Sequence, residues 1–257
     1  MRRACRGVVV TPARGLTITA ACYCPLSSDG RMAHPLTLVH LSDCQCDGLA
    51  VPDWSIQVGD SWCVFGRNGS GKQLIDQLLV GEVAPSRGVV ESRLDADQIA
   101  LISFERQQAT YEEEWRLAAT DIIPEDEWGT RVADFLPQER LEDPLIDQLN
   151  MRHRLQAFYR ELSTGESRKL MVLKALLDEA ELLICDNPFD SLDQGTVQAL
   201  SEAFRLAVAS GVAVILLLSN RSDIPQWVEQ FGHVEACLLY TSPSPRDQRG
   251  SRMPSSA

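Results

Sequence analysis

The sequence predicts an α/β fold whose core is a mostly parallel sheet, with antiparallel strands on its N-terminal side and a helical insertion. Three observations lead to this prediction. Short apolar runs alternate along the chain with amphipathic helical segments. A glycine-rich loop at 66–73 joins an apolar run to a helical pattern, and Asp186 ends another apolar run. Ligands bind at the carboxyl ends of strands in such sheets, so the last two features also predict where a site lies.

The first patterned segments are strands. Residues 37–43 and 49–60 are short strand-like runs, with a turn at Gly59, and SWCVF at 61–65 is apolar enough to be a buried strand. The segment 72–82 follows the glycine-rich loop and is a helix, because its apolar residues recur at helical spacing. Those residues are Leu74, Ile75, Leu78 and Leu79.

The middle of the chain adds two strands and then changes in character. GVVESR at 88–93 and QIALISF at 98–104 are strands by the same pattern. The stretch from about 105 to 165 contains long polar helical patterns rich in Glu, Arg and Gln. We therefore expect a helical subdomain inserted into the α/β core.

The last third of the patterned chain returns to alternating helices and strands. Residues 166–179 and 196–210 have amphipathic helical patterns, whereas 181–186 and 212–219 are continuous apolar runs of strand length. Continuous apolar strands between helices are typical of a parallel sheet covered on both faces.

Composition limits the classes of function. The 257 residues suffice for one globular domain, and the net charge of −12 disfavours binding to nucleic acid or anionic membrane surfaces. No apolar run reaches the roughly 18–20 residues that span a bilayer. The eight cysteines include C-x-C pairs rather than the C-x-x-C pairs of most zinc sites, so we expect free thiols in a reducing cytoplasm.

Both ends of the chain differ from the patterned segment 32–236. Residues 1–31 contain five arginines and no clear element, so we expect a non-native or disordered leader before a true start at Met32. Residues 237–257 are rich in Ser, Pro and Arg and resemble the conceptual translation of a transposase-type sequencing adapter. We expect the natural gene fragment to end near Ala236; the alternative is a disordered natural tail.

The glycine-rich loop has the residues of a phosphate-binding loop. It follows an apolar strand and opens a helix, where glycines let backbone N–H groups surround phosphate oxygens and the helix N-terminus favours negative charge. Lys72 is expected to bridge the β- and γ-phosphates of a nucleotide. The expected nucleotide-binding residues are Gly66, Arg67, Asn68, Gly69, Ser70, Gly71, Lys72 and Gln73.

Two further segments complete a candidate site. Asp186 ends a buried strand, where a carboxylate can hold Mg²⁺ through water. The run LSTGESRK at 162–169 opens a helix, with a cap at Ser163 or Thr164 and Glu166 in the first turn. The expected functional residues in this run are Ser163, Thr164, Gly165 and Glu166.

In this order the motifs resemble those of the ABC-type ATPases, which are P-loop NTPases. LSTGE resembles the signature LSGGQ of that family, DNPFDSLD its Walker B and D-loop run, and VILLLSN ends where its switch residue lies. Further runs, among them SFERQQATYEEEW and LSNRSDIPQWVEQFGHV, resemble the N-terminal cassette of ModF-type tandem ABC ATPases, a group associated by name with molybdenum or photorepair. The resemblance covers 36–236 and implies ATP and Mg²⁺ as cofactors.

The chain departs from the family pattern at the residues that bind the metal and activate the attacking water. Gln73 replaces the Ser or Thr whose hydroxyl ligates Mg²⁺, so the metal residues here are expected to be Asp186 and Gln73. At the catalytic positions, Asn187 replaces the family's Glu, and Asn220 replaces its switch His. An amide cannot accept a proton from water as a carboxylate does.

Two other positions of the family pattern have no single matching residue in this chain. No aromatic residue lies near Cys44, where the family's adenine-stacking ring is expected. The glutamine of the family's Q-loop has two candidate positions, Glu105 and Gln107. The residues that bind phosphate are thus retained, and those that support hydrolysis are altered.

The resemblance implies a head-to-tail pair of cassettes in which each ATP lies between one phosphate loop and the signature of the other. We therefore expect this chain to be a truncated first half of a tandem protein, to bind ATP with weak hydrolysis, and to offer its signature segment to a partner cassette. Whether the chain is an ATPase or a non-hydrolysing regulatory or scaffold module stays open, as does association with membrane subunits. A translation-factor role is disfavoured by the acidic charge.

Overall fold

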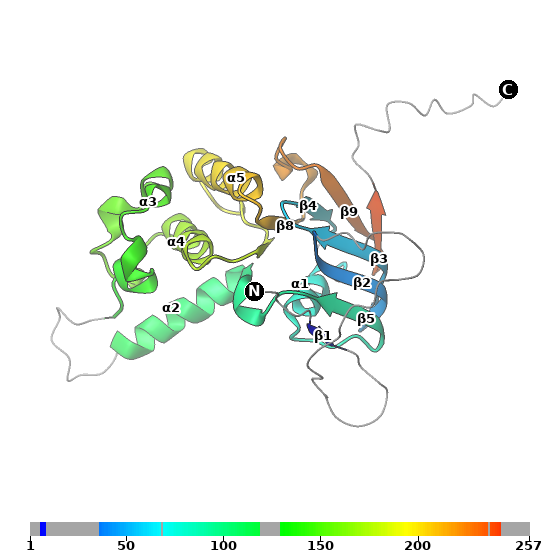
Figure 1. Cartoon of the computed structure of the whole chain (residues 1–257). Coiled ribbons are helices and arrows are strands. Elements are labelled where there is room, and N and C mark those ends of the chain that lie inside the picture. The colour runs from blue at the N-terminus through cyan, green and yellow to red at the C-terminus, as the bar shows by residue number, and fades with distance from the viewer. Residues whose placement is uncertain (1–5, 9–35, 68, 119–128, 236, 243–257) are drawn as a thin grey trace.

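The computed structural model describes residues 6–8, 36–67, 69–118, 129–235 and 237–242 (Figure 1). Their strands form one ten-stranded sheet in the order β1-β5-β2-β3-β10-β9-β4-β8-β7-β6. The five strands β9, β4, β8, β7 and β6 are parallel to one another. Their bounds are Gln230–Glu235, Ser61–Phe65, Ala213–Leu218, Leu182–Asp186 and Ile99–Ile102.

The other half of the sheet is mainly antiparallel. It contains β1 (Arg6–Val8), β5 (Arg87–Ser92), β2 (Thr37–Cys46), β3 (Leu49–Gln57) and β10 (Leu238–Ser242). Strand β10 pairs along its length with β9 and touches β3 at one residue pair. Two short strands therefore fall within the ends that the sequence separates from the cassette, and apart from Cys237 the rest of those ends lies outside the described residues. The origin of both ends stays a prediction.

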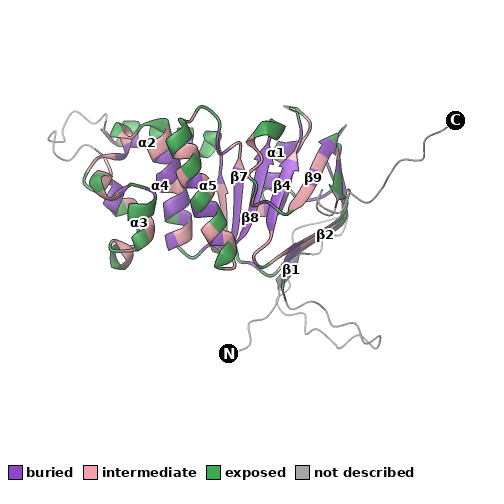
Figure 2. Cartoon of the chain, turned by 90° about the horizontal axis from the view of Figure 1, so that it is seen from above, coloured by how far each residue is buried: buried purple, intermediate pink, exposed green. Residues whose placement is uncertain are grey.

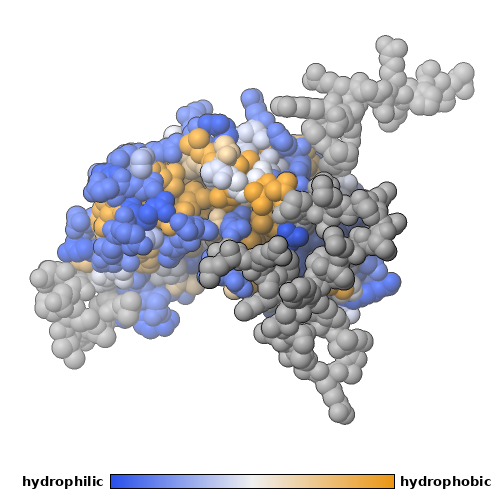
Figure 3. All heavy atoms as spheres, viewed as in Figure 1, coloured by the Kyte–Doolittle hydropathy of each residue, from blue (hydrophilic) through white to orange (hydrophobic). Residues whose placement is uncertain are grey.

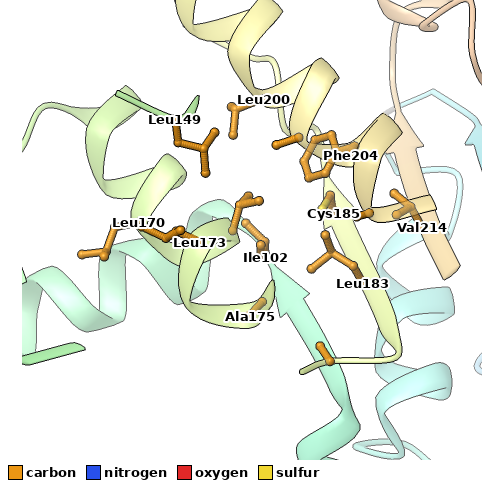
Figure 4. Packing of buried hydrophobic residues seen from close by; sticks show 14 of the residues in the cluster. Ile102, Leu149, Leu170, Leu173, Ala175, Leu183, Cys185, Leu200, Phe204 and Val214 are labelled. Atoms are coloured by element: carbon orange, nitrogen blue, oxygen red, sulfur yellow. The ribbon is translucent and has the colours of Figure 1, made fainter. Parts of the chain in front are cut away.

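Helices cover both faces of the parallel strands. Helix α1 (Lys72–Val80) shares a hydrophobic cluster with β2, β3 and one side of β4, β7 and β8. Helices α4 (Thr164–Leu177) and α5 (Gln194–Ala209) share a second cluster with the other side of the same strands. Figure 4 shows this second cluster, in which Leu173 and Phe204 lie against strand residues such as Leu183 and Cys185. The central strands are the most buried part of the sheet (Figure 2).

The predicted helical insertion is present, but one long helix accounts for much of it. Helix α2 (Phe104–Ala118) is followed, beyond 119–128, by α3 (Pro144–Gln148) and short 3₁₀ turns. The long helical patterns expected after 129 are broken because Pro137 precedes one turn, Pro144 begins α3, and Asn150 has a positive φ of 52°. Among the described residues of the whole chain, the 3₁₀ turns are Ala96–Gln98, Val132–Phe135, Gln138–Arg140, Arg152–Arg154, Tyr159–Glu161 and Arg221–Asp223.

The predicted fold class is confirmed: a mostly parallel core, antiparallel strands on the N-terminal side and an inserted helical part. Across the described ranges, no helix combines the length and apolar character needed to cross a membrane. Figure 3 shows hydrophilic residues over most of the helical side of this face, with hydrophobic residues where the helices meet the strands.

Candidate nucleotide-binding site

The glycine-rich loop connects the carboxyl end of β4 to the first turn of α1, as predicted. Gly69 and Gly71 have φ values of +76° and +96°, which side chains rarely adopt. A Cβ on Gly66 would lie 2.5 Å from the Ser70 Oγ, so this turn also has no room for a side chain. Asn68 lies outside the described residues. The glycines thus hold a tight turn ahead of the helix N-terminus, as an anion-binding loop requires.

Lys72 is linked to Asp186 by a chain of hydrogen bonds. Its Nζ donates to the Ser219 Oγ over 2.7 Å, and that hydroxyl donates to the Asn187 Oδ1 over 3.0 Å. The Ser219 backbone N–H donates to the same Oδ1, also over 3.0 Å. The Asn187 Nδ2 then donates to the Asp186 Oδ1 over 2.9 Å. The structure therefore brings together three residues that the sequence predicted, and Ser219, which it did not.

Burial and charge act in opposite directions on this chain. Burial lowers the pKa of Lys72, and the nearby carboxylates of Asp186 and Asp190 only partly offset that effect. Burial likewise raises the pKa of Asp186, with Lys72 opposing the shift. The Asp76 carboxyl, one turn into α1, is buried and its pKa rises to about 7. A bound nucleotide phosphate would stabilise the charged form of Lys72, which burial disfavours.

The arrangement fits Mg²⁺ through one carboxylate. Asp186 lies at the end of β7, as predicted, close enough to Lys72 for the two charges to interact. Mg²⁺ commonly uses one or two carboxylates, several waters and the phosphates of its substrate, so one protein carboxylate suffices. Gln73 is exposed in the first turn of α1, and Asn220 is exposed just after β8. No group of three or more His, Cys, Asp or Glu side chains suited to a metal occurs within the described residues.

The signature segment forms the capped start of α4. Ser163 is the N-cap: its Oγ accepts from the Glu166 backbone N–H over 3.3 Å, and the Glu166 Oε2 accepts from the Ser163 N–H over 2.9 Å. The Arg154 Nε donates to the Glu166 Oε1 over 2.7 Å. Burial raises the pKa of Glu166, but these hydrogen bonds outweigh it and lower the pKa overall. Thr164 is exposed, and Gly165 is partly buried, so this capped end can be presented to a second molecule.

Gln107 and Glu105, the two Q-loop candidates, differ in position. Gln107 is buried, and its Nε2 donates to the Thr164 carbonyl over 3.0 Å and to the Ser167 Oγ. Glu105 is exposed but lies close enough to interact electrostatically with Asp186. Gln107 therefore joins α2 to the signature helix, whereas Glu105 lies toward the candidate metal carboxylate.

Arg168 ties the signature helix to the turn that follows β7. Its side chain is 4% exposed, and its Nη1 lies 3.3, 3.2 and 3.1 Å from the carbonyl oxygens of Asn187, Pro188 and Asp190. Burial lowers the pKa of this guanidinium, with Asp190 opposing the shift. One buried cation thus holds the start of α4 against the residue that replaces the family's catalytic Glu.

We expected no aromatic residue near Cys44 to stack on an adenine base, and the surroundings of Cys44 agree with this. Cys44 is 1% exposed, and its thiol donates to the Val89 carbonyl over 3.1 Å, so this position offers no surface to a base. Burial raises the pKa of this thiol. The described cysteines, 44, 46, 63, 185 and 237, are all free thiols; Cys5, Cys22 and Cys24 lie outside the described residues.

Sequence reasoning missed Ser219 and Arg168. Ser219 is the last letter of the apolar run VAVILLLS, and a polar residue at the end of a buried parallel strand is a signal for the same edge of the sheet. Arg168 lies two residues after the last residue of LSTGE, where the sequence alone suggests an ordinary helix residue. Its role depends on a contact with residues about twenty positions later, which sequence periodicity does not reveal.

The fold and the loop geometry define a P-loop nucleotide-binding domain of α/β type with an inserted helical part. Comparison with protein families gives the narrower assignment. The model of the ABC transporter family matches residues 49–190, which is more than half of the chain. The chain belongs to the ABC transporter family, as an ATP-binding cassette domain, and the resemblance seen in its motifs is confirmed.

Individual relatives agree with this assignment. The ABC transporter ATP-binding protein ModF of Escherichia coli (strain K12) is 34% identical over 197 residues, 74% of this chain and 40% of ModF. The methionine import ATP-binding protein MetN 2 of Paraburkholderia xenovorans (strain LB400) is 24% identical over 164 residues, 61% of this chain and 42% of MetN 2. The chain thus spans less than half the length of these two relatives.

A solved structure shows the same fold. The ATP-binding subunit of an ABC transporter matches with a TM-score of 0.62 and 26% identity, over 83% of this chain and 92% of that subunit. The nucleotide-free cassette of another ABC transporter matches with a TM-score of 0.60 at 14% identity, a likeness that concerns the fold alone.

Proposed function

We propose that this cassette binds ATP with Mg²⁺ at the phosphate loop, hydrolyses it slowly, and offers its signature segment to a partner cassette. The glycine turn, Lys72 and the helix N-terminus provide the phosphate contacts. Asp186 would hold the magnesium ion, which stabilises the charge that develops on the transferred phosphate. Gln73, exposed in the first turn of α1, is the second metal residue that we propose.

The observation that supports slow hydrolysis is the use of every polar atom of the Asn187 amide. Its Oδ1 accepts two hydrogen bonds from Ser219, and its Nδ2 donates to Asp186. A neutral amide in this position cannot take a proton from an attacking water.

The proposed partner is a second ABC cassette, in the same full-length chain or in a dimer. The exposed Thr164 and the capped helix start support it, because they form a rigid surface whose hydrogen bonds are already made within this chain. The matched segments cover less than half of ModF and of MetN 2, so each of these relatives contains further residues beyond the matched cassette. No nucleic-acid partner is proposed, and a link to molybdenum has only the resemblance to ModF behind it.

The extent of the cassette is part of the proposal. We assign residues 32–236 to the nucleotide-binding domain, with a helical subdomain at about 105–165, and propose a cytoplasmic location. The free thiols of the described cysteines support a reducing compartment.

The test compares the parent chain with Asn187→Glu, Asn187→Gln and the double variant Asn187→Glu, Gln73→Ser. Asn187→Gln is the matched control, because it has the length of Glu but keeps the amide. We expect ATP to bind the parent with slow turnover, and we expect the double variant to turn over roughly 100-fold faster, since a general base contributes about 10²–10⁴ in rate. Asn187→Gln should stay slow. Brisk turnover by the parent, unchanged in the Glu variants, would overturn the proposal.

A non-hydrolysing regulatory or scaffold module is the second candidate. The same saturated amide of Asn187 favours it, because the group that would activate water is engaged by Ser219 and Asp186. The two functions separate in one measurement: the module would bind ATP and show no turnover in the parent above that of a Lys72→Ala control.

A further inference from the structure

A cavity of about 540 Å³ lies beside the phosphate loop, at the carboxyl ends of β4 and β9. Its lining includes Phe65, Arg67, Ser70, Arg221, His233 and Glu235. Lys72, Asp186 and Asn187, which form the hydrogen-bonded chain of the phosphate site, are not among its lining residues. The volume is within the range of small-molecule pockets, roughly 300–1,000 Å³.

The cavity belongs to the face of the sheet opposite α1. Successive strand residues alternate between the two faces. Val64 is in the cluster that contains α1, and Cys63 is in the cluster that contains α4 and α5, so Phe65 lies on the side of Cys63. On β9, Phe231 packs against the cluster of α4 and α5, which places His233 on the same side. The nucleotide phosphates are expected at the N-terminus of α1, so the cavity is a separate site.

The lining combines flat rings and two guanidinium groups with one carboxylate, that of Glu235. The rings of Phe65 and His233 are stacked, with centroids 5.6 Å apart and planes 17° apart, and the Arg221 Cζ lies 5.0 Å from the centre of the Phe65 ring. Neither Arg67 nor Arg221 pairs with a carboxylate within the described residues, although the chain as a whole carries a net charge of −12. Two guanidinium groups therefore gather where most of the molecule is acidic.

Ser70 lies between the cavity and the turn of the phosphate loop. Its Oγ is buried and has no hydrogen-bond partner among the described residues. The guanidinium groups supply the strong, charge-assisted contacts that bind carboxylate or phosphate oxygens.

We propose that this cavity binds a small planar organic anion, namely an aromatic ring that carries a phosphate or carboxylate group. The ring stacks against the Phe65–His233 pair, and the anionic group pairs with Arg221 and Arg67. Because Arg67 and Ser70 also belong to the phosphate loop, an occupant of the cavity changes the affinity of the loop for nucleotide. That coupling rests on the proposed function, whereas the cavity itself does not.

The test uses phenyl phosphate as the probe and inorganic phosphate as the reference that lacks a ring. Binding is followed by calorimetry and by the NMR signals of the His233 ring, assigned with a His233→Leu variant. We expect phenyl phosphate to bind at least 10-fold more tightly than inorganic phosphate, and Arg221→Gln or His233→Leu to weaken it by about 10-fold. In Lys72→Ala, the affinity followed by the His233 ring signals should stay within about 2-fold, because Lys72 does not line the cavity.

Each other result contradicts the proposal. No binding of phenyl phosphate, equal affinity for the ringless anion, or no effect of Arg221→Gln and His233→Leu would remove the cavity as a ligand site. Loss of binding in Lys72→Ala would place the probe in the phosphate loop instead. ATP affinity is measured separately in the same variants: failure of the parent to bind ATP overturns the proposed function and leaves the result for the cavity intact.

Discussion

The phosphate-loop side and the signature side of this cassette differ in what they retain. On the phosphate-loop side, the glycine turn and Lys72 are present, but Gln73, Asn187 and Asn220 stand where we expect the family's metal and water-activating groups. On the signature side, the capping box between Ser163 and Glu166 is complete, and the next residues of the helix, Ser167 and Arg168, are buried. Under the proposed function, the side that acts on this chain's own ATP is altered, and the side offered to a partner's ATP keeps its cap.

This difference separates the requirements of binding from those of catalysis. Phosphate binding needs backbone geometry and one cation, which tolerate changes in neighbouring side chains. Activation of water needs one particular proton acceptor at one place, and an amide does not supply it. A cassette can therefore lose turnover and keep both its nucleotide and its partner surface.

The largest effect is expected for Arg168→Met, which cuts the link between the two sides. The substitution leaves the carbonyls of Asn187, Pro188 and Asp190 without their buried donor. Loss of such a buried charged group costs about 3–4 kcal/mol of the free energy of unfolding. Urea unfolding measures it, with Arg205→Met as the control, because Arg205 pairs with Glu202 on the surface. Equal midpoints for the two variants would show that the sides are not joined through Arg168.

Lys72→Ala is expected to weaken ATP binding by roughly 100-fold, about 2–3 kcal/mol, because charge-assisted hydrogen bonds to phosphate are lost. Lys174→Ala is the matched control, since that lysine pairs with Asp178 on the surface of α4. Calorimetric titration with ATP and Mg²⁺ gives both affinities. If Lys72→Ala bound ATP as tightly as the parent does, Lys72 would not contact the bound phosphates, and the role given to it on the phosphate-loop side would be wrong.

Much of the fold could be predicted because local patterns specify it. The alternating helices and strands between 61 and 104 and between 166 and 219 are visible from apolar periodicity, and the glycine-rich loop fixes its own place between β4 and α1. The region between 129 and 163 is less predictable, since short 3₁₀ turns have helical composition without a helical length. Prolines and a positive φ at Asn150 interrupt what its polar pattern suggests.

The residues of the candidate site also differ in whether local sequence patterns could predict them. Lys72 and Asp186 could be placed from motifs whose positions relative to strands are regular. Ser219, Arg168 and the ring pair of Phe65 and His233 could not, because each contact joins residues that are distant in sequence. The contact between Phe65 and His233 depends on the parallel pairing of β4 with β9. The apolar periodicity of a strand does not indicate which strand it pairs with.

The buried Asp76 makes the stability of the phosphate-loop side depend on pH. Its pKa rises from an ordinary 3.8 to about 7 through burial, with Asp186, Glu82 and Glu105 adding to the shift. A raised pKa in the folded state means that this contribution to stability is full below pH 3.8 and is lost as pH rises toward about 7. Asp76→Asn removes the charge, so we expect it to stabilise the protein at pH 8 by about 1–2 kcal/mol.

Thermal unfolding of the parent and Asp76→Asn at pH 5, 6, 7 and 8 measures this difference. The gap in unfolding free energy should grow with pH and level off above about pH 7. Asp178→Asn, at the exposed end of α4, serves as the control and should show no such growth. A constant gap for Asp76→Asn would mean that this carboxyl is already ionised in the folded protein at pH 5.

The smallest effects are expected from removing one serine hydroxyl on each side, and they test the comparison most directly. Ser219→Ala removes the acceptor of Lys72 and a donor to Asn187, whereas Ser163→Ala removes the cap of α4. Each should cost about 1 kcal/mol of unfolding free energy. ATP affinity should fall by roughly 3–10-fold in Ser219→Ala alone, because that hydroxyl holds Lys72 in place while the cap serves a partner's nucleotide. If Ser163→Ala weakened ATP binding by the isolated chain and Ser219→Ala did not, the signature side would act on this chain's own nucleotide, and the division of roles between the two sides would be wrong.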